Sequence, residues 1–172
     1  MGPIARLALL WLCFLLLGGH AYAFDPPEGI PQVGEVGRAQ FSRFGFRIYD
    51  ARLWAPDGRY IANQPFALSL TYHRTIEGSR IVQASLDEMA KLGVMVNAHP
   101  QWRDQLARVL PDVVSGDTLT GVYQPGEGAR FYHQGKATGQ IDDNLARAFF
   151  AIWLDARTSE PGLRQALLGG KP

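Results

Sequence analysis

The sequence predicts an α+β fold, in which an antiparallel sheet carries helices layered on one of its faces. Two patterns predict it. Apolar side chains alternate with a period of two before residue 74 and again between residues 118 and 141, as in strands with one buried face. They recur at helical spacing in the segments that follow each of these regions. The order along the chain is therefore strands, two helices, a meander of strands and two helices.

The first 23 residues have the features of a secretory signal peptide and are set aside from the fold. Arg6 supplies a positive charge, Leu7 to Leu17 form an apolar run, and Ala21-Tyr22-Ala23 fits the small-x-small cleavage pattern. The run is shorter than the ~18 residues expected of a membrane-spanning helix. Cys13 lies inside the run, which does not indicate a lipid-anchoring cysteine. An uncleaved N-terminal anchor is the alternative; we expect a periplasmic or secreted protein.

Cleavage after Ala23 would leave residues 24–172, enough for one domain with a substantial core. This part contains no cysteine, so packing alone must hold it together. The whole chain has 17 Lys and Arg against 16 Asp and Glu, and removal of Arg6 would balance them. Balanced charge gives no electrostatic argument for a nucleic-acid partner or an anionic membrane. The proline-rich residues 24–32 should form an extended lead-in to a domain spanning residues 33–172.

Three strands are predicted before residue 74. Residues 33–40 form a short strand, and residues 66–73 alternate cleanly. Between them, residues 44–56 are predicted to form a central strand that ends in the turn signal Ala55-Pro56-Asp57-Gly58. A period of two divides this strand into two faces. One face carries Arg47, Tyr49, Ala51 and Leu53, and the other carries Phe46, Ile48, Asp50, Arg52 and Trp54. Because neither face is purely apolar, we expect polar side chains to reach the interior or a cleft.

The helical segments are predicted from capping and proline signals. Ser85-Leu86-Asp87-Glu88 has the spacing of a capping box, so a helix should begin at Ser85. A second helix should start near His99-Pro100 and stop at Pro111. Strands at residues 118–123, 129–133 and 137–141 follow, the last two joined by a hairpin at residues 134–136. A largely buried helix begins at Asp143, and a last helix follows Ser159 and Pro161.

Motifs of several enzyme classes are absent from the sequence. Outside the signal segment the histidines are His73, His99 and His133, and none has the i, i+4 spacing of paired metal ligands. There is no Gly-x-Ser-x-Gly elbow for a hydrolase nucleophile and no glycine-rich phosphate loop after a strand. We therefore predict neither a metal site nor a cofactor. A metal site would require ligands brought together by the tertiary fold alone.

Polar side chains on the first strands are better candidates for a site. Arg38, Arg47, Tyr49, His73 and Arg74 all come from these strands or their ends. A guanidinium offers a fixed fork of donors that suits a carboxylate, phenolate or enolate oxygen, and a tyrosine hydroxyl can donate to the same oxygen. The alternative for any single arginine is an ion pair with Asp50 or contact with solvent. As a group, these residues predict a site that binds an anion.

Several stretches resemble chalcone isomerase-like proteins. They are Gly37-Arg38 with residues 45–54 (GFRIYDARLW), residues 115–117 through 129–132, and residues 144–169, whose FFAIWLD run is similar to the exported bacterial branch of the family. The resemblance spans residues 33–169 and rests on a pattern of strands, turns and a buried helix. It implies an open-faced β-sandwich with a ligand cleft between a large antiparallel sheet and a layer of helices. It also implies that the face carrying Arg47 and Tyr49 is turned toward this cleft.

The resemblance also suggests which residues form a site. In the plant enzymes, an arginine just before the core strand helps to bind the flavonoid oxyanion during an oxa-Michael ring closure, and Arg38 matches it by position. A buried cation of this kind stabilises a phenolate nucleophile and a developing enolate. The enzymes' other polar positions are two threonines and a tyrosine. They fall on Tyr49, Ala151 and Met89, which argues against flavonoid cyclisation and for a resized cleft.

Our leading hypothesis is an exported protein that binds a small apolar or amphipathic anion, such as a fatty acid, a polyphenol or a haem-like molecule. Arg38 would contact the anionic group, Tyr49 would donate to it, and Arg47 would lie nearby. The apolar part would be lined by Met89, Phe150 and Ala151. One alternative is an isomerase or intramolecular lyase acting on a small carbonyl compound, with Tyr49 as acid and Arg38 as oxyanion stabiliser. Another is a structural or partner-binding module whose cleft is filled by its own side chains.

Overall fold

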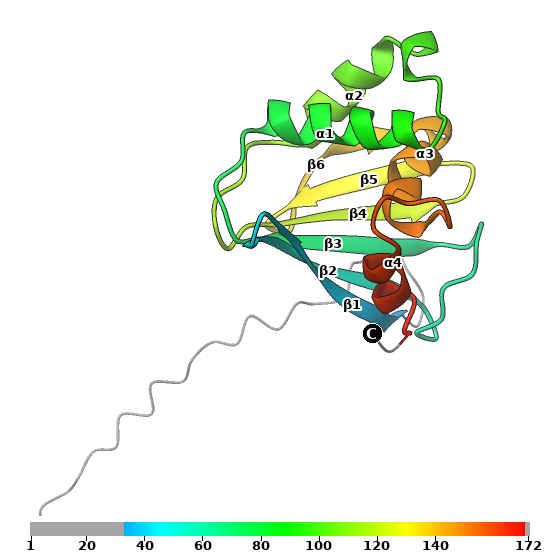
Figure 1. Cartoon of the computed structure of the whole chain (residues 1–172). Coiled ribbons are helices and arrows are strands. Elements are labelled where there is room, and N and C mark those ends of the chain that lie inside the picture. Colours follow the sequence, from blue (N-terminus) through cyan, green and yellow to red (C-terminus); the bar gives the residue numbers. More distant parts are fainter. Residues whose placement is uncertain (1–32, 171–172) are drawn as a thin grey trace, which may run out of the picture.

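A computed structural model of the chain describes residues 33–170, so the predicted signal peptide and the extended lead-in, residues 1–32, lie outside the described residues. The described chain forms one six-stranded antiparallel sheet in which every strand pairs with its neighbours in sequence (Figure 1). The strands are β1 (Val33–Arg43), β2 (Phe46–Pro56), β3 (Phe66–Tyr72), β4 (Thr118–Gln124), β5 (Gly128–His133) and β6 (Lys136–Ile141). The helices are α1 (Gly78–Lys91), η1 (Val96–Ala98), α2 (Gln101–Val109), α3 (Asp143–Leu154) and α4 (Pro161–Leu167).

The helices lie on one face of the sheet, which confirms the predicted α+β fold (Figure 1). The core is the layer between them, where Ala51 and Leu53 of β2 and Leu145 of α3 are fully buried. α1 and α3 cover the middle of the sheet, while α4 packs on β1 and α2 on β6. None of the described helices is long and apolar enough to cross a membrane.

Local signals predicted several elements well. The β5–β6 hairpin turns at Gln134 and Gly135, which both have positive φ angles of 50° and 75°, as a two-residue hairpin of this kind requires. α3 begins where the carboxylate of Asp142 accepts a hydrogen bond from the backbone N–H of Leu145. α2 follows Pro100 and ends at Val109, two residues before Pro111.

The capping-box prediction for α1 is wrong. α1 begins at Gly78, and Ser85 lies in its middle, where its hydroxyl donates to the carbonyl of Ile81. The N-terminal cap comes from a distant part of the chain, since the N–H of Gly78 donates to the Asp112 carboxylate at 2.7 Å. A side chain at residue 78 would also collide, because an added Cβ would lie 2.4 Å from the carbonyl oxygen of Leu110. A helix start that is fixed by tertiary contacts cannot be predicted from the local sequence.

The β1–β2 connection is a tight turn inside a stretch that we predicted to be strand. Phe44 and Gly45 are its two central residues, with positive φ angles of 51° and 77°. Near this turn the pairing slips by one residue, because Phe41 faces Tyr49 and Ser42 faces Arg47. Ile48 is therefore an extra residue on β2, and such a bulge shifts the alternation of side chains beyond it. As a result Arg47 does not share the inner face with Tyr49, contrary to the prediction.

Candidate functional site

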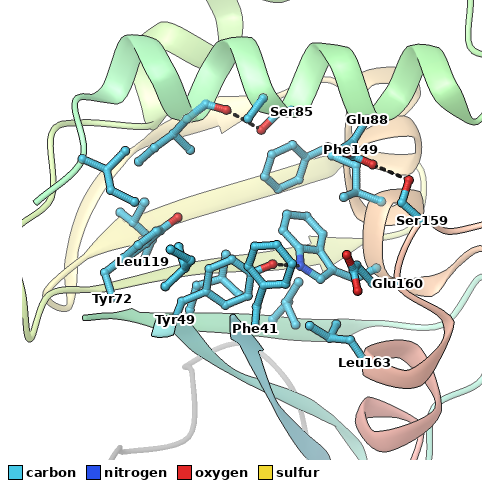
Figure 2. Close-up of a pocket in the computed structure, with 18 of the residues that line it drawn as sticks. Phe41, Tyr49, Tyr72, Ser85, Glu88, Leu119, Phe149, Ser159, Glu160 and Leu163 are labelled. Carbon is cyan, nitrogen blue, oxygen red and sulfur yellow. Dashed lines mark hydrogen bonds between the residues drawn. The ribbon is translucent and has the colours of Figure 1, made fainter. Parts of the chain in front are cut away.

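A cavity of about 540 Å³ lies between the sheet and the helices (Figure 2). Its floor is made by the inner faces of β1 to β5, and its roof by α1 and α3. Most of the residues that line it are apolar. Among the described residues, the charged ones in its wall are Arg43, Arg80, Glu88, Lys91 and Glu160. The volume falls within the ~300–1,000 Å³ that is usual for small-molecule sites.

Aromatic rings from α3 form one wall of the cavity and hold one another in place. Phe149 packs edge-on against Phe150 at 5.4 Å between ring centroids and against Trp153 at 5.2 Å. Phe131 of β5 meets Phe149 edge-on at 5.4 Å and stacks on Phe150 at 6.3 Å. Gly121 of β4 makes this packing possible, because an added Cβ would lie 2.8 Å from the Phe150 ring. These mutual contacts keep the wall rigid, so the space is preformed.

Tyr49 carries a hydroxyl into this space, as predicted. Its oxygen accepts a hydrogen bond from the indole N–H of Trp153 at 3.1 Å (Figure 2). Its ring stacks on Phe41 at 5.0 Å and meets Tyr72 edge-on at 5.9 Å. Burial raises the pKa of Tyr49 to about 12, which outweighs the lowering effect of the Trp153 bond. The phenol is therefore neutral at physiological pH, and its O–H remains available to donate.

Tyr72 lies beside Tyr49 in the sheet register and lines the same cavity. The residue is only 4% exposed, and burial raises the pKa of its hydroxyl well above the ordinary value. Within residues 33–170, no protein group forms a hydrogen bond with this hydroxyl. Because protein atoms do not seal off this oxygen completely, it can pair with a molecule in the cavity. The sequence placed Tyr72 on the same face as Leu68 and Leu70 but gave it no role.

The charged side chains of the cavity wall include both cations and carboxylates. Arg43 ends β1, and Arg80 lies in the first turn of α1. Glu88, further along α1, accepts from Lys91 and from Ser159, each at 2.7 Å. Glu88 and Glu160 both raise the pKa of Tyr49 by their negative charge. Arg43 has no carboxylate within salt-bridge distance in the described part of the chain, but its positive charge acts on Glu88 and helps to lower the pKa of that carboxyl.

The structure brings only some of the predicted residues to the cavity. Tyr49 and Phe150 line it, whereas Arg38, Arg47, Met89 and Ala151 do not. Met89 is fully buried in the core, and Ala151 is half-buried on α3. Arg47 borders a separate shallow depression with Phe46, His73 and Arg74, and it donates to Asp50, which also bonds His73 at 3.0 Å. The ion pair with Asp50 that we considered as the alternative for an arginine is thus the one that Arg47 makes.

Arg38 does not reach the cleft. Gly37 faces α4, since an added Cβ would lie 2.3 Å from the carbonyl oxygen of Ala166, and Ala39 packs on the core. Arg38 between them must point to the opposite face. Its side chain is 68% exposed and donates to Glu35 at 2.7 Å. The predicted contact between Arg38 and an anion in the cleft does not fit this placement, because the match by position was one residue out of phase with the inward face.

Comparison with known proteins places the chain in a family. It belongs to the chalcone isomerase-like family, whose model matches residues 37–169. The chain is 25% identical over 135 residues to a Haemophilus influenzae protein described as uncharacterized, a match that covers 78% of this chain and 67% of that protein. The described residues contain no group of three or more histidine, cysteine or carboxylate side chains that could hold a metal ion.

The fold is also found in a solved plant structure. An Arabidopsis thaliana fatty-acid binding protein superposes with a TM-score of 0.64, covering 81% of this chain and 88% of that one. The two sequences are only 10% identical, so the likeness shows the shared fold and leaves the ligand open.

Proposed function

We propose that the chain is a binding protein for a small amphipathic anion of the fatty-acid type, held in the cavity between the sheet and the helices. The observation that carries the proposal is a largely apolar cavity of about 540 Å³ whose wall also holds cations and two tyrosines. The fatty-acid binding of the plant neighbour supports this choice of ligand class. Burial of a hydrocarbon chain contributes about 0.8 kcal/mol per CH₂ group, so a long chain binds such walls well.

The ligand's polar end is assigned to the hairpin side of the cavity. Phe41, Tyr49 and Tyr72 form one row across β1, β2 and β3, and Arg43 lies two residues beyond Phe41 on β1. Arg43 supplies a positive charge, and the tyrosine hydroxyls supply donors to a carboxylate oxygen. The hydrocarbon chain then extends toward the aromatic wall on α3. The other cations of the wall, Arg80 and Lys91, pair with Glu77 and Glu88, whereas Arg43 has no carboxylate within salt-bridge distance among the described residues.

A displacement titration tests this proposal. A fluorescent polyene fatty acid is bound first, and palmitate, a polyphenol and haem compete for it. We expect palmitate to displace the probe best. Arg43→Gln should weaken binding about tenfold or more, since a hydrogen bond to a charged group contributes roughly 1.5–3 kcal/mol. Arg38→Gln is the matched control, because it removes the same charge from the other face of the sheet.

Two outcomes contradict the assignment. Failure of the polyene probe to bind, or its displacement by a polyphenol or haem and not by palmitate, would rule out the ligand class. A loss of affinity in Arg38→Gln but not in Arg43→Gln would restore the site that the sequence predicted and remove the one proposed here.

The isomerase alternative required an arrangement of side chains that the structure does not have. That hypothesis required Arg38 and Tyr49 to act on the same oxygen, and the structure places them on opposite sides of the sheet. The raised pKa of Tyr49 also makes its phenol a poor acid near neutral pH. We expect no turnover on a panel of chalcones and small enones. Turnover that disappears in Tyr49→Phe would overturn this view.

We also propose that the protein is exported after cleavage at Ala23. Support comes from Arg6, the apolar run from Leu7 to Leu17 and the Ala21-Tyr22-Ala23 site. The intact mass of the protein recovered from a periplasmic extract should correspond to a chain that begins at Phe24. An N-terminus at residue 1 or 2 would show instead that the segment is retained.

A further inference from the structure

The turn between β1 and β2 exposes two aromatic rings, which are separated in sequence only by Gly45. Phe44 is 86% exposed and Phe46 is 59% exposed. The other large hydrophobic residues that are exposed within residues 33–170 are Ile61, Met95 and Val114, and each stands alone in a different connection. Scattered single residues of that kind are normal, whereas a pair in one short turn indicates a surface that is covered in use.

The backbone of the turn shows that Phe44 is not there for folding. Both central residues of the turn have positive φ, and the first of these positions favours Asn, Asp or Gly. Phe44 occupies it with a φ of 51°, a conformation that is strained for a bulky residue. The strained residue is also the most exposed large hydrophobic side chain described. A residue that is unfavourable for both the turn and the solvent points to a function outside the fold.

Arginines surround the two rings. The Arg43 guanidinium lies 5.3 Å from the centre of the Phe44 ring, and that of Arg74 lies 4.7 Å from the centre of the Phe46 ring. Arg47 is nearby, but Asp50 neutralises it. Neither Arg43 nor Arg74 has a carboxylate within salt-bridge distance in the described part of the chain. The turn is therefore basic even though the charges of the whole chain nearly balance.

The turn also borders the cavity. Arg43 and Phe44 belong to its wall, so a surface that covers the turn lies directly over this part of the cavity. Aromatic rings combined with arginines suit the boundary between lipid headgroups and acyl chains, where rings insert and cations meet lipid phosphates. A protein partner fits less well, because one short turn offers far less than the ~800 Å² per partner of a stable protein interface.

We propose that the β1–β2 turn docks this domain on an anionic lipid bilayer, with Phe44 and Phe46 inserted at the interface and Arg43 and Arg74 on lipid phosphates. Docking in this orientation brings the cavity to the membrane, so an acyl ligand can pass between bilayer and protein without crossing water. That transfer step rests on the proposed function, whereas docking itself does not.

Vesicle flotation tests the proposal with a chain that begins at Phe24, since the sheet, the helices and the core all lie within residues 33–170. Vesicles of phosphatidylglycerol and phosphatidylcholine should carry the protein, and vesicles of pure phosphatidylcholine should carry much less. Arg74→Gln should weaken binding about fivefold, and Phe46→Ser should weaken it further. The matched controls Arg59→Gln and Met95→Ser remove an exposed cation and an exposed apolar side chain elsewhere and should change nothing.

Phe44→Asn separates a role in docking from a role in folding, because the two predict opposite signs. Asn suits the turn better than Phe, so the melting temperature should rise by about 2–4 °C. The same variant should bind anionic vesicles less. Unchanged vesicle binding would overturn the proposal, as would equal losses in the control variants. Loss of concentration-dependent self-association in place of vesicle binding would assign the turn to a protein interface and would also overturn it.

Fatty-acid binding in solution distinguishes failure of docking from failure of the proposed function. Phe46 and Arg74 do not line the cavity, so Phe46→Ser and Arg74→Gln should keep their affinity for the polyene probe. A wild-type chain that floats with anionic vesicles but binds no fatty acid leaves docking in place and removes the ligand. A chain that binds fatty acid but ignores anionic vesicles does the reverse.

Discussion

The two faces of the sheet are built from alternate residues of the same strands, yet their side chains pack differently. On the outer face, small hydroxyl side chains bond to each other, with the hydroxyls of Ser69 and Thr120 lying 3.0 Å apart while these residues are only 2% and 7% exposed. On the inner face the side chains are large and apolar, and the helices above them leave about 540 Å³ unfilled.

The polar groups of the two faces also differ in whether they have hydrogen-bond partners within the protein. Outer-face groups find partners in the protein, as in the cross-strand pair Thr71 and Thr118 and in the contacts of Asp50 with Arg47 and His73. On the inner face, Tyr49 has a partner in Trp153, and Tyr72 has none among residues 33–170. In the site that we propose, the hydroxyl of Tyr72 pairs with a ligand, and the following experiments test the difference between the two faces in order of expected effect.

The largest effect should come from the aromatic wall. Phe150→Ala removes a ring that is almost fully buried and should lower the free energy of unfolding by about 3–5 kcal/mol. Val122→Ala is the outer-face counterpart and removes only two methyl groups from a small cluster with Trp54 and Ala67, so its cost should be clearly smaller. Urea unfolding of both variants measures the contrast. Equal costs would mean that the wall contributes no more than the outer face.

The two inner-face tyrosines should respond differently to loss of the hydroxyl. Tyr49→Phe leaves the buried N–H of Trp153 without its acceptor and should cost about 1–3 kcal/mol of stability. Tyr72→Phe removes a hydroxyl without a protein partner and should leave stability unchanged or slightly higher. Both variants should weaken fatty-acid binding. A Tyr72→Phe variant that loses stability but keeps full affinity would show that its hydroxyl serves the fold.

The outer-face hydroxyl pair should show strong non-additivity. Ser69→Ala alone leaves the buried hydroxyl of Thr120 unpaired and should cost about 1–2 kcal/mol. The double variant Ser69→Ala with Thr120→Val replaces both partners by apolar groups and should be nearly neutral. Thermal unfolding of the two single variants and the double variant measures this coupling. Additive losses would mean that the hydroxyls do not bond to each other.

The smallest effect concerns Asp50 and depends on pH. Burial raises its pKa, but hydrogen bonds from Arg47 and His73 outweigh burial and hold the pKa of Asp50 below its usual value. Its stabilising contribution is therefore fully present above the ordinary aspartate pKa of ~3.9 and is lost as the pH falls through the lower folded value. Asp50→Asn should cost less than about 1 kcal/mol at pH 7, as is usual for exposed pairs.

The difference between wild type and Asp50→Asn should shrink as the pH falls below the ordinary aspartate range. Denaturant unfolding of both proteins at several pH values measures this difference in stability. A difference that stays constant down to the acid limit would show that the carboxylate charge of Asp50 contributes nothing.

The sequence predicted those features that depend on neighbouring residues. The alternation of β3, the turn at Gln134 and Gly135, and the start of α3 beside Asp142 are all local, because a period, a turn residue or a cap acts within a few positions. The family resemblance added the cleft and placed Tyr49 at its wall. The sequence also indicated that Tyr72 shares a strand face with Leu68 and Leu70 and that the aromatic rings of α3 share an apolar face. It did not predict that these residues line a cavity.

The predictions that were wrong concern features that depend on contacts between residues far apart in the chain, or on a shift of one residue along a strand. The start of α1 is fixed by Asp112, which lies 34 residues after the Gly78 that it caps. The bulge at Ile48 turns Arg47 away from Tyr49, and no composition signal marks it. Arg38 was assigned to the cleft by position, but β1 presents Gly37 and Ala39 to the helices, so Arg38 faces outward. In a strand, an error of one residue reverses the face and hence the function.

The most direct measurement is a crystal structure of the chain with bound palmitate. We predict the hydrocarbon chain between α3 and the inner face of the sheet, in contact with Phe150, and the carboxylate near Arg43 and the hydroxyls of Tyr49 and Tyr72. Palmitate on the outer face beside Arg38, or a carboxylate bound in the cavity away from Arg43 and both tyrosine hydroxyls, would contradict this account.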